Sequence, residues 1–380
     1  MLCARSLGSR FCVVPYENLK EGRLIRDVPV AGVKNLRELV ECLKNPEPYL
    51  KREIQEEIPS IINTDMGMDF SDIEGQEGAK RAAEIAVSGF HNLLLIGPPG
   101  TGKTMLARRL PTIMPGLGFE EKLELTRIYS IAGLLSREHP LIDERPFRSP
   151  HHTSTPQAIA GGGRNPRPGE ITLAHKGVLF LDEMPEFARG SLEVLRQPLE
   201  DKQIQLSRAS GTYVFPAGFI LVAAMNPCPC GYYPDMNKCR CTPGEVSHYL
   251  HKLSQPLLER IDLCADVPPV NFSQISGEKS GESSALIRKR VEKARRIQQK
   301  RYQNEKICFN GELSGKQIRK YCVLTENAFQ VAKNAFELME LSARSYHRIL
   351  RVSKNDRRSG WTGKKISEEH LSEALGYTHG

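Results

Sequence analysis

Residues 91–104 read HNLLLIGPPGTGKT. The apolar run over 93–96 predicts a buried strand, and the sequence that follows the stretch, MLARRL, predicts a helix. The loop between them fits the phosphate-loop pattern G-x-x-x-x-G-K-[ST], in the strand, loop, helix order that this pattern requires. The predicted nucleotide-binding loop consists of Gly97, Pro98, Pro99, Gly100, Thr101, Gly102, Lys103 and Thr104.

The residue types of this loop suit a polyphosphate. Glycines let the backbone turn with its N–H groups pointing inward, and these donors would ring the phosphates at the positive end of the following helix. Lys103 would reach the β and γ phosphates of ATP, and the Thr104 hydroxyl would bind Mg²⁺. The alternative is a glycine- and proline-rich turn that fits the pattern by chance, which the flanking strand and helix disfavour.

A second predicted strand supplies two carboxylates. Residues 177–183 read GVLFLDE, so a buried strand ends at Asp182 and Glu183. After a phosphate loop, Asp182 would hold the Mg²⁺ shell and Glu183 would polarise the attacking water, because a carboxylate beside the γ-phosphate suits that task. The alternative is a strand that simply ends in an acidic loop.

Two further polar residues extend the predicted hydrolysis site. The apolar run over 219–225 predicts a buried strand that ends at Asn226, whose amide would orient the water or sense the γ-phosphate. Residues 254–263 predict a short helix that carries Arg260 into a strand over 263–267. The Arg260 cation would face the nucleotide of a neighbouring subunit, and the alternative is a surface salt bridge.

Four of the ten cysteines form a cluster in the sequence. One C-x-C pair is followed by another after a short loop, and four thiolates brought together by two tight turns suit tetrahedral Zn²⁺. A disulfide framework is disfavoured, because such frameworks belong to small secreted domains. The alternative to structural zinc is a cluster of free thiols in a loop. The predicted ligands are Cys228, Cys230, Cys239 and Cys241.

The composition is that of a soluble globular protein, with 39% hydrophobic and 26% charged residues. The N-terminus is too polar for a signal peptide and no apolar run of about 18 residues occurs, so we expect a cytoplasmic protein without a membrane span. Residues 285–380 contain 21 Lys and Arg against 10 Asp and Glu, whereas residues 1–284 carry a net charge of −3. This asymmetry suggests a polyanion near the C-terminal segment, although a solvated helical face is the commoner meaning.

Breakers and changes of composition divide the chain into five predicted segments. Within the third, the proline-rich residues 145–169 predict an irregular insert with a short helix over 157–160, residues 189–199 predict one helix, and residues 203–216 predict a β-hairpin. The segments are an N-terminal piece with a short strand and an amphipathic helix (1–50), a polar linker (51–68), an α/β domain (69–272), a linker rich in Ser and Gly (273–284) and a basic helical domain (285–380).

Three stretches carry a resemblance to a known family. They are RSPHHTSTPQAIAGGG at 148–163, GVLFLDEMPEF at 177–187 and AMNPCPCGYY at 224–233. From about residue 69 onward the chain resembles the YifB/ComM family of magnesium-chelatase-like bacterial AAA+ ATPases. The resemblance implies a three-layer α/β/α domain around a parallel sheet, followed by a small all-helical lid.

The resemblance also implies roles for the residues already named. In this clade the insert over 145–169 corresponds to the helix-2 insert, and 203–216 to the pre-sensor-1 hairpin. Arg344, in the stretch LSARSY, corresponds to sensor 2. The other roles are Walker A for 97–104, Walker B for Asp182 and Glu183, sensor 1 for Asn226 and the arginine finger for Arg260.

DNA is the partner that the resemblance implies. Family members of the ComM type are hexameric helicases that promote branch migration of recombining DNA, notably during natural transformation. In relatives that translocate on DNA, the insert and the hairpin line the central pore of the ring. The basic residues that we expect at the DNA are Arg164, Arg167 and Arg208.

Two departures from the family pattern stand out. Family members carry a Lon-protease-like domain in front of the ATPase, and residues 1–50 resemble only its last part, so we expect a shortened form. After Val352 the family continues with a Thr-Ile-Ala-Asp-Leu type of run, whereas this chain reads SKNDRRSGW, which would loosen the lid near sensor 2.

Two alternatives to a DNA motor remain at this stage. Magnesium chelatase subunits share the architecture and remodel a protein partner for metal insertion into a porphyrin. A zinc-stabilised scaffold or DNA-binding module that binds nucleotide without turnover is the second alternative.

Overall fold

The computed structural model describes residues 4, 7–23, 28–51, 67–135, 141–163, 166–208, 211–271, 281–355 and 365–378. The chain forms two compact units, Met1–Asp65 with Gly133–Ile142 and Met66–Ala132 with Asp143–Gly380. Most of the first predicted linker (52–66), most of the second (272–280) and Arg164 lie outside the described residues.

The first unit is built on a short parallel strand pair. An amphipathic helix predicted over 36–43 is present as α3 (Leu36–Lys44), and the Asn35 side chain accepts the Glu38 N–H to cap it. The buried side chains are few: Leu19, Val28, Val30, Ala31 and Cys42. The remaining elements are β1 (Cys12–Pro15), a 3-10 turn (Tyr16–Asn18), α2 (Leu19–Gly22), β2 (Val30–Val33) and α4 (Glu47–Leu50).

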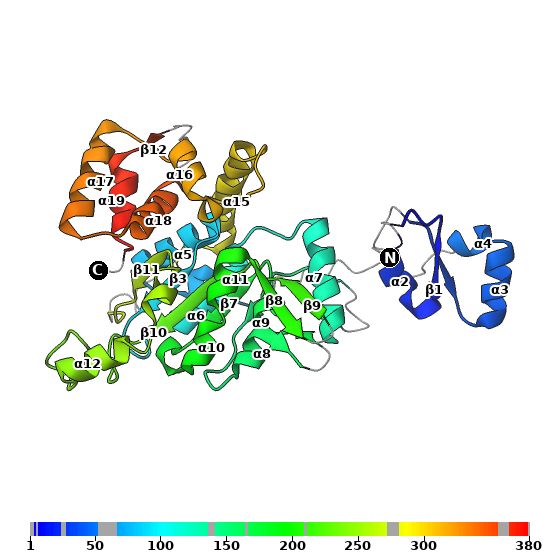
Figure 1. Cartoon of the computed structure of the whole chain (residues 1–380), viewed down its shortest axis with the longest axis horizontal. Coiled ribbons are helices and arrows are strands. Elements are labelled where there is room, and N and C mark those ends of the chain that lie inside the picture. Colours follow the sequence, from blue (N-terminus) through cyan, green and yellow to red (C-terminus); the bar gives the residue numbers. More distant parts are fainter. Residues whose placement is uncertain are drawn as a thin grey trace. The chain divides into compact units, whose positions relative to one another are not determined.

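The second unit is organised around a five-stranded sheet in which every neighbouring pair is parallel. The spatial order is β11-β3-β10-β7-β4, so the third and fourth strands along the chain separate the first from the second. Four of these strands, β3, β7, β10 and β11, are labelled in Figure 1. The strands are β3 (Leu93–Ile96), β4 (Phe147–Arg148), β7 (Val178–Leu181), β10 (Ile220–Met225) and β11 (Leu263–Asp266).

Helices cover both faces of this sheet. Alternate residues of a strand point to opposite faces, and accordingly Leu93 and Leu95 join one core cluster whereas Leu94 joins another. The first cluster includes α5 (Glu77–Gly89), α6 (Lys103–Ile113) and α15 (Ser284–Arg301). The second includes α9 (Glu170–Leu173), α10 (Arg189–Glu193), α11 (Arg196–Asp201), α12 (Pro243–Leu250) and α13 (Gln255–Leu258). The predicted three-layer α/β/α fold is confirmed.

The predicted insert and hairpin both form. The insert contains α8 (Pro156–Ala160) and a two-residue antiparallel ladder of β5 (Gly161–Gly162) with β6 (Arg167–Pro168). The hairpin pairs β8 (Gln203–Arg208) with β9 (Gly211–Pro216) from Gln203 opposite Pro216 to Arg208 opposite Gly211. The single helix predicted over 189–199 is wrong, because α10 and α11 are separate short helices. Between the phosphate-loop helix and the insert lies α7 (Phe119–Ala132).

The C-terminal region is helical, as predicted, with one addition. A parallel pair of two-residue strands, β12 (Val323–Leu324) and β13 (Lys365–Ile366), joins the segment before α17 to the segment before α19. No helix among the described residues is long and apolar enough to cross a membrane. The helices beyond α15, grouped in gold to red in Figure 1, are α16 (Gly315–Tyr321), α17 (Glu326–Leu338), α18 (Ala343–Ser353) and α19 (Glu368–Leu375).

Candidate nucleotide site and cysteine cluster

The phosphate loop joins the end of β3 to the start of α6. A Cβ at Gly97 would lie 2.2 Å from the Val267 carbonyl oxygen, so only glycine fits there. Gly102 has a φ of +91°, which glycine adopts at little cost, and it precedes the first turn of α6. The unpaired N–H groups of an α-helix's first turn favour an anion, so the sequence has shaped an anion-binding loop.

Lys103 is held at the centre of this loop. Its Nζ donates to the carbonyl oxygens of Gly97 (2.6 Å) and Pro98 (2.8 Å) and to Oδ1 of Asn226 (3.2 Å). Burial lowers the pKa of Lys103, and the nearby carboxylates of Asp182 and Glu183 act in the opposite direction. Lys103 therefore links the loop to the end of β10.

Thr104 and Asp182 are also in contact. The Thr104 hydroxyl donates to Oδ2 of Asp182 over 2.7 Å, joining the first turn of α6 to the end of β7. A hydroxyl and a carboxylate oxygen are ligands that Mg²⁺ accepts beside bound phosphates. The structure thus brings together Lys103, Thr104, Asp182 and Asn226 at the carboxyl ends of three adjacent strands, which is where parallel sheets bind ligands.

Glu183 projects from the same edge in an unusual backbone conformation. Its φ is +50°, and its side chain is 61% exposed. Oε2 of Glu183 lies 3.7 Å from Nδ1 of His152, in the insert that follows β4. The His152 ring in turn lies 4.1 Å, centroid to centroid, from that of His151. Sequence reasoning missed His152; the adjacent histidines directly after β4 were the signal.

The backbone of Arg260 lies at the end of β3 opposite the phosphate loop, and Arg344 pairs with the preceding residue, Glu259. Asn92, which precedes β3, donates to the Arg260 carbonyl oxygen over 2.8 Å. The phosphate loop follows the other end of β3, and four residues at about 3.3 Å each separate the two ends by about 13 Å. Arg344 pairs with Glu259 at 2.9 Å, whereas the Arg260 guanidinium contacts Glu200.

The four predicted zinc ligands converge. Their Sγ atoms all lie within 4.8 Å of one another, with separations that include 3.4, 3.5 and 3.8 Å. Tetrahedral zinc with Zn–S bonds of about 2.3 Å places sulfurs about 3.8 Å apart, so this arrangement fits the ion. Backbone N–H groups of Tyr232 and Arg240 lower the pKa of the Cys230 thiol to about 6. None of the four cysteines, Cys228, Cys230, Cys239 and Cys241, forms a disulfide.

The site opens into a hollow of about 700 Å³. Glu183 and Asn226 of the predicted nucleotide site line it, and so do Pro229 and Thr242, which are sequence neighbours of the clustered cysteines. The nucleotide site and the cysteine cluster are therefore neighbours.

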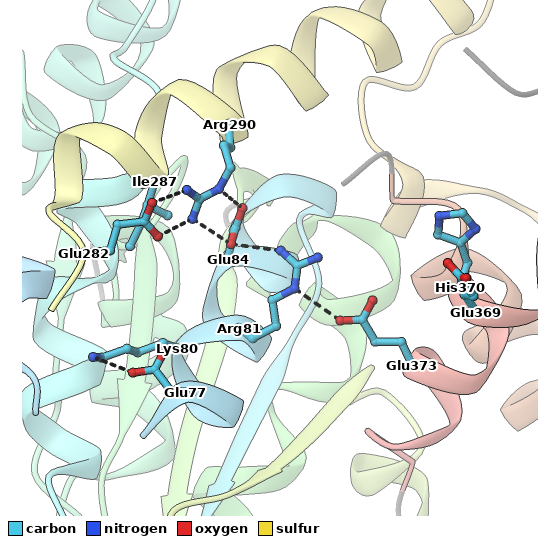
Figure 2. A pocket seen from close by; sticks show the side chains of 10 residues that line it. All are labelled: Glu77, Lys80, Arg81, Glu84, Glu282, Ile287, Arg290, Glu369, His370 and Glu373. Atoms are coloured by element: carbon cyan, nitrogen blue, oxygen red, sulfur yellow. Dashed lines mark hydrogen bonds and ion pairs between the residues drawn. The ribbon is translucent and has the colours of Figure 1, made fainter. Parts of the chain in front are cut away.

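A second hollow, of about 720 Å³, is charged and contains none of the predicted site residues (Figure 2). Glu84 of α5 is its centre: it binds Arg81 of its own helix and Arg290 of α15. Arg290 also pairs with Glu282, and Arg81 reaches Glu373 of α19 at 3.2 Å. This network joins the C-terminal helices to α5.

Two family models match the chain. The magnesium chelatase subunit ChlI model matches residues 69–275, and the model of the ChlI C-terminal domain matches residues 281–378. The two matches cover the α/β sheet with its loop and the helical region.

Named relatives match nearly the full chain. Competence protein ComM of Haemophilus influenzae is 41% identical over 380 residues, which cover 99% of this chain and 73% of the relative. YifB of Salmonella typhimurium is 42% identical over 373 residues, 97% of this chain and 71% of the relative. YifB of Escherichia coli is 45% identical over 310 residues, 81% of this chain and 60% of the relative. The chain belongs to the YifB/ComM family of magnesium-chelatase-like AAA+ proteins.

Proposed function

We propose that this protein hydrolyses ATP with Mg²⁺. The observation that carries the proposal is the convergence of Lys103, Thr104, Asp182 and Asn226 at one sheet edge, with bonds of 2.7 Å and 3.2 Å joining them in pairs. Each is a residue type that nucleotide hydrolysis requires, and each of the two bonds joins residues at least 78 positions apart in the sequence.

Each residue has a part in the reaction. Lys103 would bind the β and γ phosphates, while Thr104 and Asp182 would hold Mg²⁺, which when bound neutralises charge on the phosphates. Asn226 would orient the water between the loop and β7. The exposed carboxylate of Glu183 would accept a proton from that water as it attacks the γ-phosphate.

Completion of the site by a second copy of the chain is part of the proposal. The Arg260 backbone lies at the amino end of β3, about 13 Å of strand away from its own phosphate loop, and Arg344 pairs with the adjacent Glu259. In a ring of identical subunits, a heterologous interface sets one surface of each subunit against a different surface of the next, and we propose that this brings the arginines to the neighbour's phosphate loop. Both arginines would then reach the γ-phosphate of a neighbour, and we propose a hexamer.

DNA is the proposed client. One relative is named competence protein ComM, and residues 285–380 carry a net charge of +11. The exposed Arg167 of the insert and the hairpin β8–β9 are the elements that we propose to contact DNA backbone, the Arg208 side chain lying outside the described part of the chain. Single-stranded or branched DNA, helicase activity and branch migration in recombination or transformation follow as the proposed role.

Remodelling of a protein partner is the second candidate, and the match to the ChlI model favours it. A salt-dependent DNA response separates the two, because phosphate contacts release counterions and weaken steeply with salt. We expect forked DNA to raise ATP turnover of this chain at 50 mM salt and to lose most of that effect at 300 mM. Turnover that no DNA structure alters at either salt concentration would reject DNA as the client.

We also propose Zn²⁺ for the cysteine cluster. The sulfur separations fit tetrahedral coordination, and two of the four cysteines, Cys228 and Cys239, are buried. The reducing cytoplasm, where we expect this protein, keeps such thiols unpaired. One zinc per chain, measured by metal analysis of purified protein, is the expected result.

A further inference from the structure

The cysteine segment, residues 226–242, leaves the nucleotide site directly. Asn226 directly follows β10, the strand that lies between β3 and β7, and Cys228 comes two residues later. Oδ1 of Asn226 accepts from Lys103 Nζ, so the segment starts at a residue that touches the phosphate-loop lysine. A displacement of Cys228 would therefore also displace the side-chain amide of Asn226, which we propose to orient the water.

A second contact joins the cysteine segment to the phosphate loop. Gly231 packs so closely on Pro99 that a Cβ at Gly231 would lie 2.5 Å from Cδ and 3.1 Å from Cγ of Pro99. Gly231 also has a φ of +89°, which an L side chain rarely adopts. The backbone of the cysteine segment thus lies against the tip of the phosphate loop with no room for a methyl group.

The residue that touches Pro99 is held by a cysteine. The N–H of Gly231 lies 3.2 Å from Sγ of Cys228 and 3.0 Å from its carbonyl oxygen. The N–H of Tyr233 lies 3.4 Å from the same sulfur. A sulfur that is fixed by a metal would fix this turn, and through it the position of Gly231 against the loop.

Apart from hydrogen bonds within its own turns, the cysteine segment has little regular structure or apolar packing to fix its conformation. It contains no helix or strand between β10 and α12, and its own core cluster consists of cysteines and Val246 of α12. Its larger apolar side chains Tyr232, Tyr233 and Met236 are exposed. Four cysteine side chains and one valine bury little apolar surface, so a bound metal ion would contribute most of the stability of this segment's conformation.

We propose that the zinc-bound cysteine segment braces the phosphate loop, so that metal occupancy sets the affinity for nucleotide. Gly231 is the positioning residue that transmits the brace to Pro99, and Asn226 is the second link. This inference rests on the proposed nucleotide and zinc sites, and it adds a physical connection between them.

The test measures ADP affinity, zinc content and melting temperature on the full chain. Gly231→Ala is expected to keep one zinc and to raise the Kd for ADP at least tenfold, with a lower melting temperature because alanine is strained at a φ of +89°. Gly133→Ala is the matched control, because Gly133 also has a positive φ (+74°) but a Cβ there meets no atom within 4 Å. Removing zinc from wild-type protein with a chelator is expected to raise the Kd in the same way.

A double-mutant cycle tests the contact itself. Pro99→Ala removes the two atoms that the new methyl group would strike, so Gly231→Ala is expected to weaken ADP binding less in that background. A Gly231→Ala protein that keeps its zinc and binds ADP like wild type overturns the brace. Wild-type protein that binds no ADP overturns the nucleotide site instead, and protein purified without metal overturns the zinc site.

Discussion

Glu84 is the residue whose loss should most weaken the junction between the α/β sheet region and the C-terminal helices (Figure 2). Its carboxylate accepts from Arg81 at 3.0 Å and from Arg290 at 2.8 and 3.2 Å, and its side chain is only 11% exposed. Glu84→Gln keeps the shape, removes the charge and turns an amide N–H₂ group toward a guanidinium. Removing one partner of a buried pair costs about 3–5 kcal/mol.

The partial exposure of both arginines reduces this cost, because water screens the charges left behind. We therefore expect a loss of about 2.5 kcal/mol in the free energy of unfolding. At about 2–4 °C per kcal/mol, the melting temperature should fall by about 5–10 °C in a circular-dichroism melt.

Glu369 supplies the control. It lines the same hollow, is exposed, and pairs with no cation among the residues that the structure describes. Glu369→Gln should shift the melting temperature by less than about 1 °C, as substitutions of exposed residues usually do. A Glu84→Gln protein that melts with wild type, or a Glu369→Gln protein that melts equally early, would refute the reasoning.

Three further predictions concern the nucleotide site. His152→Ala should lower kcat about tenfold at unchanged ADP affinity, because it frees Glu183 from the imidazole 3.7 Å away; an unchanged kcat would contradict this. Arg260→Ala should lower kcat at least about hundredfold, as loss of an arginine finger does. Mixing this variant with a Lys103→Ala protein should restore turnover, because an intact phosphate loop of one variant then meets an intact Arg260 of the other. A mixture no more active than its parts would argue against a site shared between subunits. Arg344→Ala should lower turnover without changing the melting temperature, because its side chain is 71% exposed; wild-type turnover would remove it from the site.

Strand ends made much of the site predictable from sequence. The buried runs that form β3, β7 and β10 are short and apolar; β7 and β10 are followed directly by Asp182 and Asn226, and β3 by the phosphate loop. Because the carboxyl ends of parallel strands share one edge, Lys103, Asp182 and Asn226 were expected to meet there, and Figure 1 shows the three strands together. Local sequence patterns predict site residues when the topology brings the ends of the strands that carry them to one edge of the sheet.

Local patterns also failed in one helix. A single helix was predicted over 189–199, but Pro198 has no N–H and would clash with the carbonyl four residues earlier in a continuous helix. The chain breaks instead, and Pro198 lies in the first turn of α11, where N–H groups have no helical partner. Pro198 in the sequence therefore favours two short helices over one.

Long-range packing explains what sequence reasoning left open. The position of Arg344 depends on α18, which packs along residues 259–262. The Arg348 guanidinium donates to the Ile261 carbonyl oxygen, and Arg351 forms an ion pair with Asp262. The contact of Gly231 with Pro99 spans more than a hundred residues of sequence. Neither follows from periodicity or spacing, because each arises only once the layers have packed.

The central claim is that this site turns ATP over, and Glu183→Gln tests it most directly. Phosphate release should be measured for wild type and the variant alongside the Kd for ADP. We predict that the wild-type chain hydrolyses ATP, that Glu183→Gln lowers kcat at least about hundredfold, and that ADP affinity stays within about twofold, because the carboxylate acts on the water and not on the nucleotide. Equal turnover in the two proteins, or none in the wild type, would contradict the account and favour a nucleotide-binding scaffold.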